Sequence, residues 1–587
     1  DDAGDPTRLS RFSHLSGKPE MHRNLAALAL LTLAACTPSS PSTGPTPRPA
    51  DTVRIGAGRI ERLVYRPVSP ALPAIPAANG ALAIRIIHPT QGQARPRVDS
   101  TFVYGSVGTG QAALEINGTA VPVAPNGAFL AYLPMPQDGT WRLRAQRGAE
   151  EVTQSVAYAT PAAGGGTGGN SAASATAVYE TARLGTVTGG ADTLATGSDA
   201  IYARPTPTGP YRWFFPRGAR LAVAERRGEQ YRVRLDEGTE AWIDESALSL
   251  TEAAPPPPAP GPVNSFVSQT ADGLDLRVTA GGRPFLVETS DSGAVVTVYG
   301  VTGGTMAAST PFGGWYRMMG QRQAGGASRF ELSLAGGAWG YKAWYEDDGD
   351  LVVRIRKPPV IDPQNPLRGR RIVIDPGHPP AGATGPTGYY EGDANLAIAL
   401  PLAEKLRARG AEVILTRTTR EGVVSSTNSG QELRARVDLA VRQNAEMLVS
   451  VHNNAFGEGA NPFRAHGTSV YYFHPFAAGL ARELDREIVA LTRIPDIGAR
   501  QQNLALARPT WLPATLTESL FMPIPEQEAA LRDPAFVERL ADAHLRGIEA
   551  WLRGRAAAQA GDGRCSSGWR TCCAARATDR SFDGPRR

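Results

Sequence analysis

The sequence predicts a multidomain protein in which small all-β domains precede a C-terminal α/β domain. The chain has 587 residues, which is too many for one compact core. Its 64 Gly and 48 Pro residues indicate linkers and short β-modules rather than long helical bundles. After residue 370, strand-like runs alternate with helical patterns. This alternation predicts a mainly parallel sheet with helices on both faces.

The region before residue 370 divides by composition and turn signals. Alternating apolar runs separated by Asn117-Gly118 and Asn126-Gly127 predict an immunoglobulin-like β-sandwich. The predicted order is a Pro/Ser/Thr tether at 37–80, this sandwich at 81–160, a Gly-rich linker at 161–177, a β-module at 178–250, a Pro-rich linker at 251–262, a further β-domain at 263–358, the α/β domain at 370–555 and a disordered tail at 556–587.

The start of the chain carries the pattern of an export signal. A short basic segment at Met21 precedes an apolar run up to Leu33, which is too short to span a bilayer. The stretch from Leu33 to Cys36 resembles a bacterial lipobox, which implies a lipid anchor at Cys36; the alternative is an ordinary signal peptide with an incidental Cys. We expect residues 1–36 to be a misassigned start followed by a lipoprotein-type signal peptide. The protein is then exported to the cell envelope, either periplasmic or membrane-anchored.

Charge and cysteine usage exclude several classes of site. The net charge of +5 and pI of about 9.0 suit an anionic wall or membrane surface, and no nucleic-acid motif is present. None of the four Cys residues lies between residues 37 and 564. A disulfide framework and a thiolate zinc site are therefore excluded for the body of the protein.

The α/β domain is predicted from its apolar runs. One helix is expected at 393–409, with Asp393 as its N-cap and Gly410 as its stop. The spacing of Leu433, Val437 and Val441 predicts a second helix. Strands are expected at 371–374, 412–415, 447–451, 469–473 and 514–517.

Two histidines follow buried-type strands directly. His378 comes after the first strand and His452 after the third, and ligands of open α/β sheets bind at the carboxyl ends of the strands. Glu391 follows a Gly-rich loop that could return it to the same edge. Two His and one Glu with an open fourth position is a catalytic zinc pattern. Zinc in such a site activates a water molecule, and Glu518, at the end of the last strand, could move the proton.

Spacing alone leaves this ligand set unresolved. Each of the four residues also has an ordinary structural interpretation as a strand end, loop or helix start. His474 also follows a strand and competes as a ligand, whereas His466 precedes that strand and is less well placed. His544 is expected on the surface of a C-terminal amphipathic helix.

Five ordered motifs across about 180 residues resemble the zinc-dependent N-acetylmuramoyl-L-alanine amidases (type-3 amidase family). They are Ile374-Asp375-Pro376-Gly377-His378, Glu391 through Asn395-Leu396-Ala397-Ile398-Ala399, Val413-Ile414-Leu415-Thr416-Arg417, Ser450-Val451-His452-Asn453-Asn454 and Leu512-Pro513-Ala514-Thr515-Leu516-Thr517-Glu518. The resemblance implies that His378, Glu391 and His452 bind Zn²⁺ and that Glu518 is the catalytic Glu. It also implies hydrolysis of the amide bond between N-acetylmuramic acid and L-alanine, with peptidoglycan as the partner, in cell-wall remodelling or cell separation.

The β-rich modules fit such an enzyme as wall-targeting domains. The module at 178–250 resembles a bacterial Src-homology-3-like module, and the position of 263–358 resembles that of an AMIN-like β-domain. The sequence departs from the family at Pro379-Pro380, Leu520 and Pro523-Ile524, which affects the shape of the site rim rather than ligand chemistry. Two alternatives stay open: a zinc carboxypeptidase or endopeptidase acting on stem peptides, and a non-catalytic cell-wall-binding scaffold. The sequence identifies no activator protein.

Overall fold

The structure is a computed structural model that describes residues 69–159, 176–196, 201–251, 262–308, 314–424, 426 and 428–564. The expected signal segment with Cys36, most of the tether, and nearly all of the two linkers lie outside these residues. So does the end of the expected tail. The last part of the tether is described, and it packs against the C-terminal domain: Ser69 Oγ donates a hydrogen bond to the carbonyl of Thr492, and Leu72 joins that domain's core.

The first β-region forms two sheets around one core. Strand order is β1-β2-β5 in one sheet and β4-β3-β6-β7 in the other. Side chains from both sheets, including Val103, Ile116, Phe129 and Trp141, share one buried cluster. This agrees with a sandwich, and its immunoglobulin-like class stays a prediction. The strands are β1 (Arg85–His88), β2 (Ser100–Ser106), β3 (Ala113–Ile116), β4 (Thr119–Val121), β5 (Ala128–Pro134), β6 (Thr140–Arg147) and β7 (Glu150–Ala157).

The next region forms a seven-stranded sheet in the order β11-β10-β14-β13-β12-β8-β15. Its likeness to a Src-homology-3 module stays a prediction. The strands are β8 (Thr176–Val187), β10 (Ile201–Arg204), β11 (Trp213–Phe215), β12 (Arg220–Arg227), β13 (Gln230–Arg234), β14 (Glu240–Asp244) and β15 (Leu248–Thr251).

The third β-region has a six-stranded sheet, β20-β16-β17-β24-β23-β9, and a four-stranded sheet, β18-β19-β22-β21. Strand β9 (Thr193–Leu194) comes from the preceding region, so the two regions are not separate in structure. The AMIN-like class stays a prediction. The other strands are β16 (Ser265–Gln269), β17 (Gly273–Val278), β18 (Phe285–Ser290), β19 (Gly293–Tyr299), β20 (Met306–Ala308), β21 (Tyr316–Ala324), β22 (Ala327–Leu334), β23 (Gly340–Tyr345) and β24 (Leu351–Arg356).

The C-terminal region is an α/β domain with a mixed six-stranded sheet in the order β26-β25-β27-β30-β28-β29. All neighbouring pairs are parallel except β28 and β30, which run antiparallel. The prediction of a C-terminal sheet with helices is therefore confirmed. The strands are β25 (Arg371–Pro376), β26 (Glu412–Leu415), β27 (Met447–Asn454), β28 (Thr468–Tyr472), β29 (Asp496–Gln501) and β30 (Ala514–Phe521).

Helices cover both faces of this sheet, which is why its central strands are apolar throughout. Helices α1, α3 and α5 share one core with inward residues of β25 and β27, whereas α2 packs on the opposite face with Val373 and Leu448. The helices are α1 (Glu391–Ala408), α2 (Ser429–Arg442), α3 (Ala478–Thr492), α4 (Pro525–Arg532) and α5 (Pro534–Arg564). Because α5 extends to Arg564, the predicted start of a disordered tail at residue 556 is too early.

The start of α1 corrects one prediction. The helix begins at Glu391 with Tyr390 as its N-cap, so Asp393 lies in the first turn and does not cap it. Asp393 instead accepts two hydrogen bonds from Arg420. The C-terminal prediction is confirmed, since Gly410 follows the helix with a φ of +87°.

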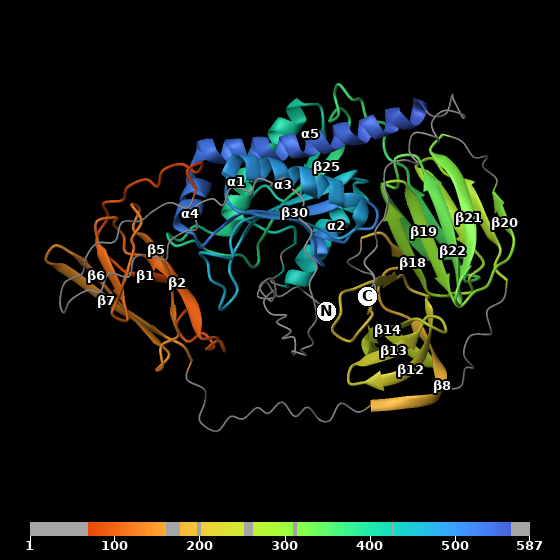
Figure 1. Cartoon of the computed structure of the whole chain (residues 1–587), viewed down its shortest axis with the longest axis horizontal. Coiled ribbons are helices and arrows are strands. Elements are labelled where there is room, and N and C mark those ends of the chain that lie inside the picture. The colour runs from red at the N-terminus through yellow and green to blue at the C-terminus, as the bar shows by residue number, and fades with distance from the viewer. Residues whose placement is uncertain are drawn as a thin grey trace, which may run out of the picture.

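The β-regions contact opposite ends of the α/β domain (Figure 1). The six-stranded sheet of the third β-region contacts the end where the parallel strands begin. Trp339 Nε1 donates to the carbonyl of Glu446 at 2.7 Å, directly before β27. The buried Arg356 donates to the carbonyls of Ala445 and Trp511. The carboxyl end of β30 and the loop after β27 instead contact the first sandwich, β1–β7.

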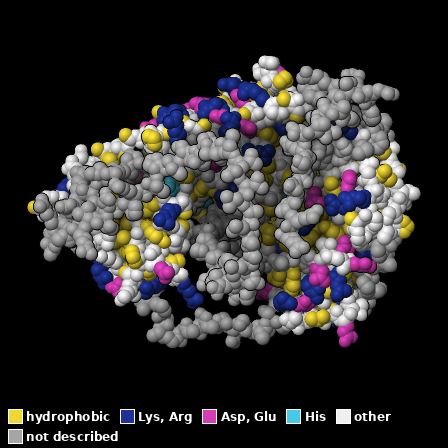
Figure 2. Space-filling view, in the orientation of Figure 1, with side chains coloured by type: hydrophobic (Ala, Val, Ile, Leu, Met, Phe, Trp, Pro, Cys, Tyr) yellow, Lys and Arg dark blue, Asp and Glu magenta, His cyan; other side chains and the backbone are white. Residues whose placement is uncertain are grey.

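The visible surface carries mixed charge. Figure 2 shows basic and acidic side chains interspersed along α5 rather than gathered in a basic stripe. Among the described residues, no helix combines the length and apolar character that crossing a bilayer requires.

Two histidines are core residues of the α/β domain. His544 on α5 is fully buried, with Nε2 3.1 Å from Thr517 Oγ1, so the expectation that it lies on the surface is wrong. His474 is buried with Nε2 2.9 Å from the carbonyl of Arg508. Burial lowers the pKa of each imidazole to about 4.

These histidines predict an acid-sensitive fold. In the unfolded chain each titrates near pH 6.5, so below that pH the unfolded state binds more protons than the folded state. Their contribution to the free energy of unfolding is complete above pH 6.5 and is lost as pH falls to about 4, by roughly 3 kcal/mol per histidine. We expect urea unfolding of the His474→Gln/His544→Gln variant to show a shallower pH dependence between pH 7 and 4.5. An unchanged pH slope would contradict this assignment.

Candidate metal centre

Three side chains meet at the carboxyl edge of the sheet. One ligand atom from each of His378, Glu391 and His452 lies within 4.8 Å of the others. His378 Nε2 is 3.0 Å and His452 Nδ1 is 3.2 Å from Glu391 Oε1. The two imidazole rings meet edge to face with centroids 4.8 Å apart. These are the residues that the family resemblance implies as ligands, and within the described residues no other group of His, Cys, Asp and Glu has this geometry.

Neighbouring parallel strands bring the two histidines together. Strands β25 and β27 pair in register from Ile372 with Met447 to Pro376 with Val451. His378 lies two residues beyond the end of β25, whereas β27 continues past His452 to Asn454. Gly377 permits the approach, because a Cβ at that position would lie 2.2 Å from the His452 ring. His378 itself has a φ of +62°, which is unusual for a non-glycine residue and typical of a functional site.

Glu391 is the most enclosed member of the group. Its Oε1 accepts hydrogen bonds from the backbone N–H of Asn453 at 3.2 Å and from Asn395 Nδ2 at 3.3 Å. Its Oε2 accepts the N–H of Ala383 at 2.9 Å. Burial alone would raise the pKa of Glu391, but the charge of His378 and hydrogen bonds from both imidazoles hold it below the ordinary range. As the first residue of α1, this carboxylate also lies at the positive end of the helix dipole.

A buried ion-pair network lies under the His378 loop. Arg436 on α2 is 1% exposed and donates to Asp375 Oδ1 at 2.9 Å and to Glu432 Oε1 at 2.8 Å. The same guanidinium donates to the carbonyls of Pro376 at 2.8 Å and His378 at 2.9 Å. Burial alone would raise the pKa of Asp375. The charge on Arg436 and hydrogen bonds from two hydroxyl groups outweigh this effect, so the pKa of Asp375 is lowered.

A second arginine binds the same loop from the end of β26. Arg417 donates to the carbonyl oxygens of Pro376, Gly377 and Gly392 at 2.7–2.8 Å. Burial, followed by the nearby Arg436 charge, lowers the pKa of Arg417 to about 10, so it stays protonated at neutral pH. Arg417 belongs to one of the five motifs that carry the family resemblance, whereas Arg436 was not identified from the sequence. Its only local signal is Glu432 one turn earlier on the same helix.

Glu518 lies beside the ligands. It pairs with His452 across β27 and β30, so the two side chains leave the sheet on the same face. The pairing then shifts between His452 and Asn454, a bulge of the kind that redirects side chains near functional sites. Burial and the nearby Glu391 charge raise the pKa of Glu518. Its Oε2 is buried and has no hydrogen-bond partner in the described part of the chain. The residue lies within β30, not at its end as predicted.

The rival histidines do not join this group. His466 is buried with Nδ1 2.8 Å from the carbonyl of Pro462, and His474 and His544 have the core contacts described above. Each therefore has a structural partner and lies outside the group formed by His378, Glu391 and His452.

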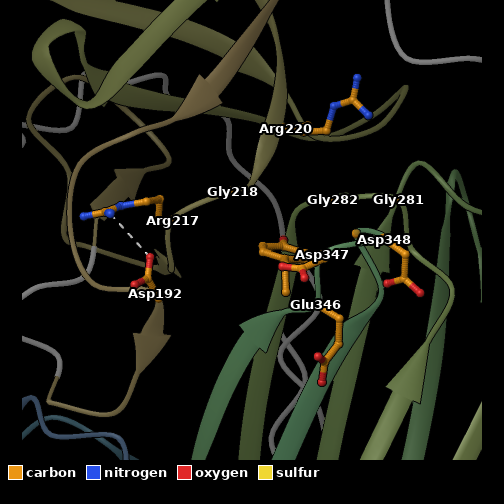
Figure 3. Close-up of a pocket in the computed structure, with 11 residues that line it drawn as sticks. Asp192, Arg217, Gly218, Arg220, Gly281, Gly282, Glu346, Asp347 and Asp348 are labelled. Atoms are coloured by element: carbon orange, nitrogen blue, oxygen red, sulfur yellow. Dashed lines mark ion pairs between the residues drawn. The ribbon is translucent and has the colours of Figure 1, made fainter.

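A separate hollow of about 380 Å³ lies between the second and third β-regions (Figure 3). Asp192 and Arg217, 3.5 Å apart, line one side, and the acidic turn from Glu346 to Gly349 lines the other. None of the metal-centre residues lines it. Its charged side chains are largely exposed and of both signs, so it has no convergent set of buried polar groups like that of the metal centre.

Known proteins match the C-terminal domain. The chain is 32% identical over 193 residues to the probable cell wall amidase LytH of Staphylococcus aureus, which covers 32% of this chain and 60% of that protein. It thus spans about 60% of the length of the curated relatives it matches.

Solved structures of similar sequence cover the same part of the chain. The N-acetylmuramoyl-L-alanine amidase from Clostridium difficile 630 is 29% identical, with a TM-score of 0.28, covering 32% of this chain and 97% of that one. The catalytic domain of CwlV, from Bacillus (Paenibacillus) polymyxa var. colistinus, is 30% identical with a TM-score of 0.28, covering 31% and 98%.

A family model also matches this part of the chain. Residues 372–550 match the model described as N-acetylmuramoyl-L-alanine amidase, and this range contains all three candidate ligands and Glu518. Residues 372–550 are therefore similar to the N-acetylmuramoyl-L-alanine amidase family, which this family model describes.

Proposed function

We propose that this protein is a zinc-dependent amidase that hydrolyses the bond between N-acetylmuramic acid and L-alanine in peptidoglycan. The observation that carries the proposal is the convergence of His378, Glu391 and His452 within 4.8 Å, inside a domain of the amidase family. Cell-wall remodelling or cell separation is the process that such a reaction serves.

The donor set supports zinc as the metal. Two imidazoles and one carboxylate, without a thiolate, are the protein ligands of catalytic zinc sites that keep a fourth position for water or substrate. Asn395 and the Asn453 amide fix the carboxylate, as the outer hydrogen bonds of a metal ligand commonly do. Zinc bound there would act as a Lewis acid toward the scissile carbonyl and would acidify a water molecule.

Glu518 is the proposed general base and acid. Its carboxylate takes a proton from the attacking water as the water oxygen bonds to the amide carbon. The same proton then passes to the alanine nitrogen as the carbon–nitrogen bond breaks, which leaves a carboxylic acid and a free amine. The free Oε2 and the position beside His452 support this role.

We also propose that the enzyme works in the cell envelope. The relative named a cell wall amidase supports a cell-wall location. A lipid on Cys36 would hold the chain at a membrane, and the β-regions would bring the catalytic domain to the wall.

Substitution of Glu518 separates chemistry from metal binding. In the Glu518→Gln variant the amide cannot act as a base, so we expect kcat to fall by roughly 10²- to 10⁴-fold while zinc content stays unchanged. Glu412→Gln, the same change at an exposed strand end, is the control. Turnover of defined muropeptides and metal analysis of the purified proteins measure both quantities. Full activity of the Glu518→Gln variant would remove this residue from the mechanism.

Product analysis distinguishes the amidase from the other zinc hydrolases. Mass spectrometry of digested peptidoglycan should show muramic-linked glycan together with intact stem peptides. A chelator should stop the reaction, and added Zn²⁺ should restore it. Release of D-alanine would indicate a carboxypeptidase, and bound zinc without any product would indicate a wall-binding scaffold.

The anchor is tested by fractionation. The full chain produced in a bacterium should sediment with membranes, whereas Cys36→Ser should shift to the soluble envelope fraction because a lipid can no longer be attached. Equal distribution of the two proteins would contradict the anchor and leave an ordinary signal peptide.

A further inference from the structure

The first sandwich docks on the α/β domain through an apolar sheet face. Phe102 and Tyr104 of β2 and Leu130 of β5 form one buried cluster with Phe521 and Ile524. Successive residues of a strand face opposite sides of the sheet. Val103, which lies between Phe102 and Tyr104, accordingly lies in the core of the sandwich. The β1-β2-β5 sheet is therefore buried on both faces, which is unusual for the outer side of a two-sheet sandwich.

A carboxylate of the α/β domain is held by this sandwich. Glu458 Oε1 accepts from Gln93 Nε2 at 2.6 Å and lies 3.1 Å from His88 Nε2, and its Oε2 accepts from Thr101 Oγ1 at 2.9 Å. Tyr132 donates to the carbonyl of the next residue, Gly459, at 3.2 Å. This carboxylate lies in the loop that follows β27, the strand that carries the second histidine ligand.

The sandwich also contacts the loop before Glu391. Tyr104 donates its hydroxyl to the carbonyl of Thr384 at 3.1 Å. The adjacent Ala383 makes two hydrogen bonds with Glu391: its N–H donates to Oε2 and its carbonyl accepts the Glu391 N–H, each at 2.9 Å. Arg85 crosses the same loop, since a Cβ on Gly388 would lie 2.5 Å from its Nη1.

The docked sandwich leaves part of each candidate histidine ligand uncovered. The side chains of His378 and His452 remain 17% and 13% exposed although the sandwich holds the loops beside them. A domain that blocked the site would cover these rings. The contacts therefore suit support of the rim rather than closure.

We propose that the first sandwich positions the metal centre: Tyr104 fixes the loop that orients Glu391, and Glu458 fixes the loop that follows His452. Both are positioning residues, because they act through other groups. The inference rests on the proposed metal site but not on the identity of the substrate. A chain without these contacts should still contain the three candidate ligands, but their loops should no longer be held in the geometry that binds the metal.

The test compares two double variants of the full chain. Tyr104→Phe/Glu458→Gln removes one tyrosine hydroxyl and one carboxylate charge at the rim while keeping side-chain volume. Tyr345→Phe/Asp275→Asn removes the same groups inside the third β-region, where Tyr345 donates to a backbone carbonyl and Asp275 binds an arginine. The control residues lie away from residues 381–392 and from the loop after β27.

Two measurements report on the site without enzymatic turnover. Hydrogen exchange of the metal-free chain over residues 381–392 should be roughly 10-fold faster in the rim variant, because each lost hydrogen bond favours opening of the loop. Competition with a chromophoric chelator should show zinc affinity roughly 10-fold weaker, a size typical of outer partners of metal ligands. The control variant should match the wild type in both.

The outcomes separate this inference from the proposed activity. Unchanged exchange and zinc affinity in the rim variant would overturn the positioning role, as would equal loosening in the control variant. If the rim variant does not fold, Tyr104→Phe alone, with melting followed by circular dichroism, carries the same comparison. If the wild-type chain binds zinc but releases no product from peptidoglycan, the proposed function is contradicted. The comparison of hydrogen exchange and zinc affinity between the two variants is unaffected by that result.

Discussion

The candidate metal centre depends on one buried positive charge, the guanidinium of Arg436. Removing a guanidinium from water costs several kcal/mol unless its donors are matched. Here two carboxylates and the carbonyls of the His378 loop accept hydrogen bonds from the guanidinium. The hydroxyl groups of Ser450 and Thr416 also donate to the carboxylate of Asp375. The arrangement stabilises a backbone that is unfavourable by itself, since His378 has a positive φ. The fold thus holds one ligand in a strained conformation through charge buried beneath it.

The two ends of the parallel strands contact different β-regions, with different consequences for the domain. At the starting end, Arg356 and Trp339 of the third β-region cap the loops before β27 and β30 with hydrogen bonds to carbonyls. These contacts are far from the chemistry and stabilise the body of the domain. At the carboxyl end, the ligand loops leave the sheet without strand partners, and the sandwich contacts them there. Two β-regions thus contact the α/β domain in different ways, one at the start of the parallel strands and one at the loops beside the candidate ligands.

Sequence reasoning was strongest where the information is local. Apolar runs placed the strands that deliver the two histidine ligands, whereas the choice of Glu391 came from the ordered family motifs. Errors arose where distant segments make a residue's environment: His544 was expected on the surface because its own helix looks amphipathic, yet α5 packs it under β30. The spacing of Glu432 and Arg436 indicates an ion pair on α2, but it does not show that Arg436 reaches the loop after β25. Strand β2 does carry a local signal of its docking, because residues 102–104 are apolar in succession and a strand buried on both faces must have a partner on each.

The family match and the docking contacts fall on different parts of the chain. The matched residues 372–550 contain the candidate ligands and Glu518, together with the buried Arg417 and Arg436. Tyr104 and the groups that hold Glu458 come from outside that range. Within that range, Glu528 of α4 accepts hydrogen bonds from the backbone N–H groups of Thr387 and Tyr389, in the loop before Glu391. A domain with such loops can gain order from a neighbour, and this chain provides that neighbour as an apolar sheet face with a few directed hydrogen bonds. Preorganisation of the metal centre then depends on the architecture of the whole chain rather than on the catalytic domain alone.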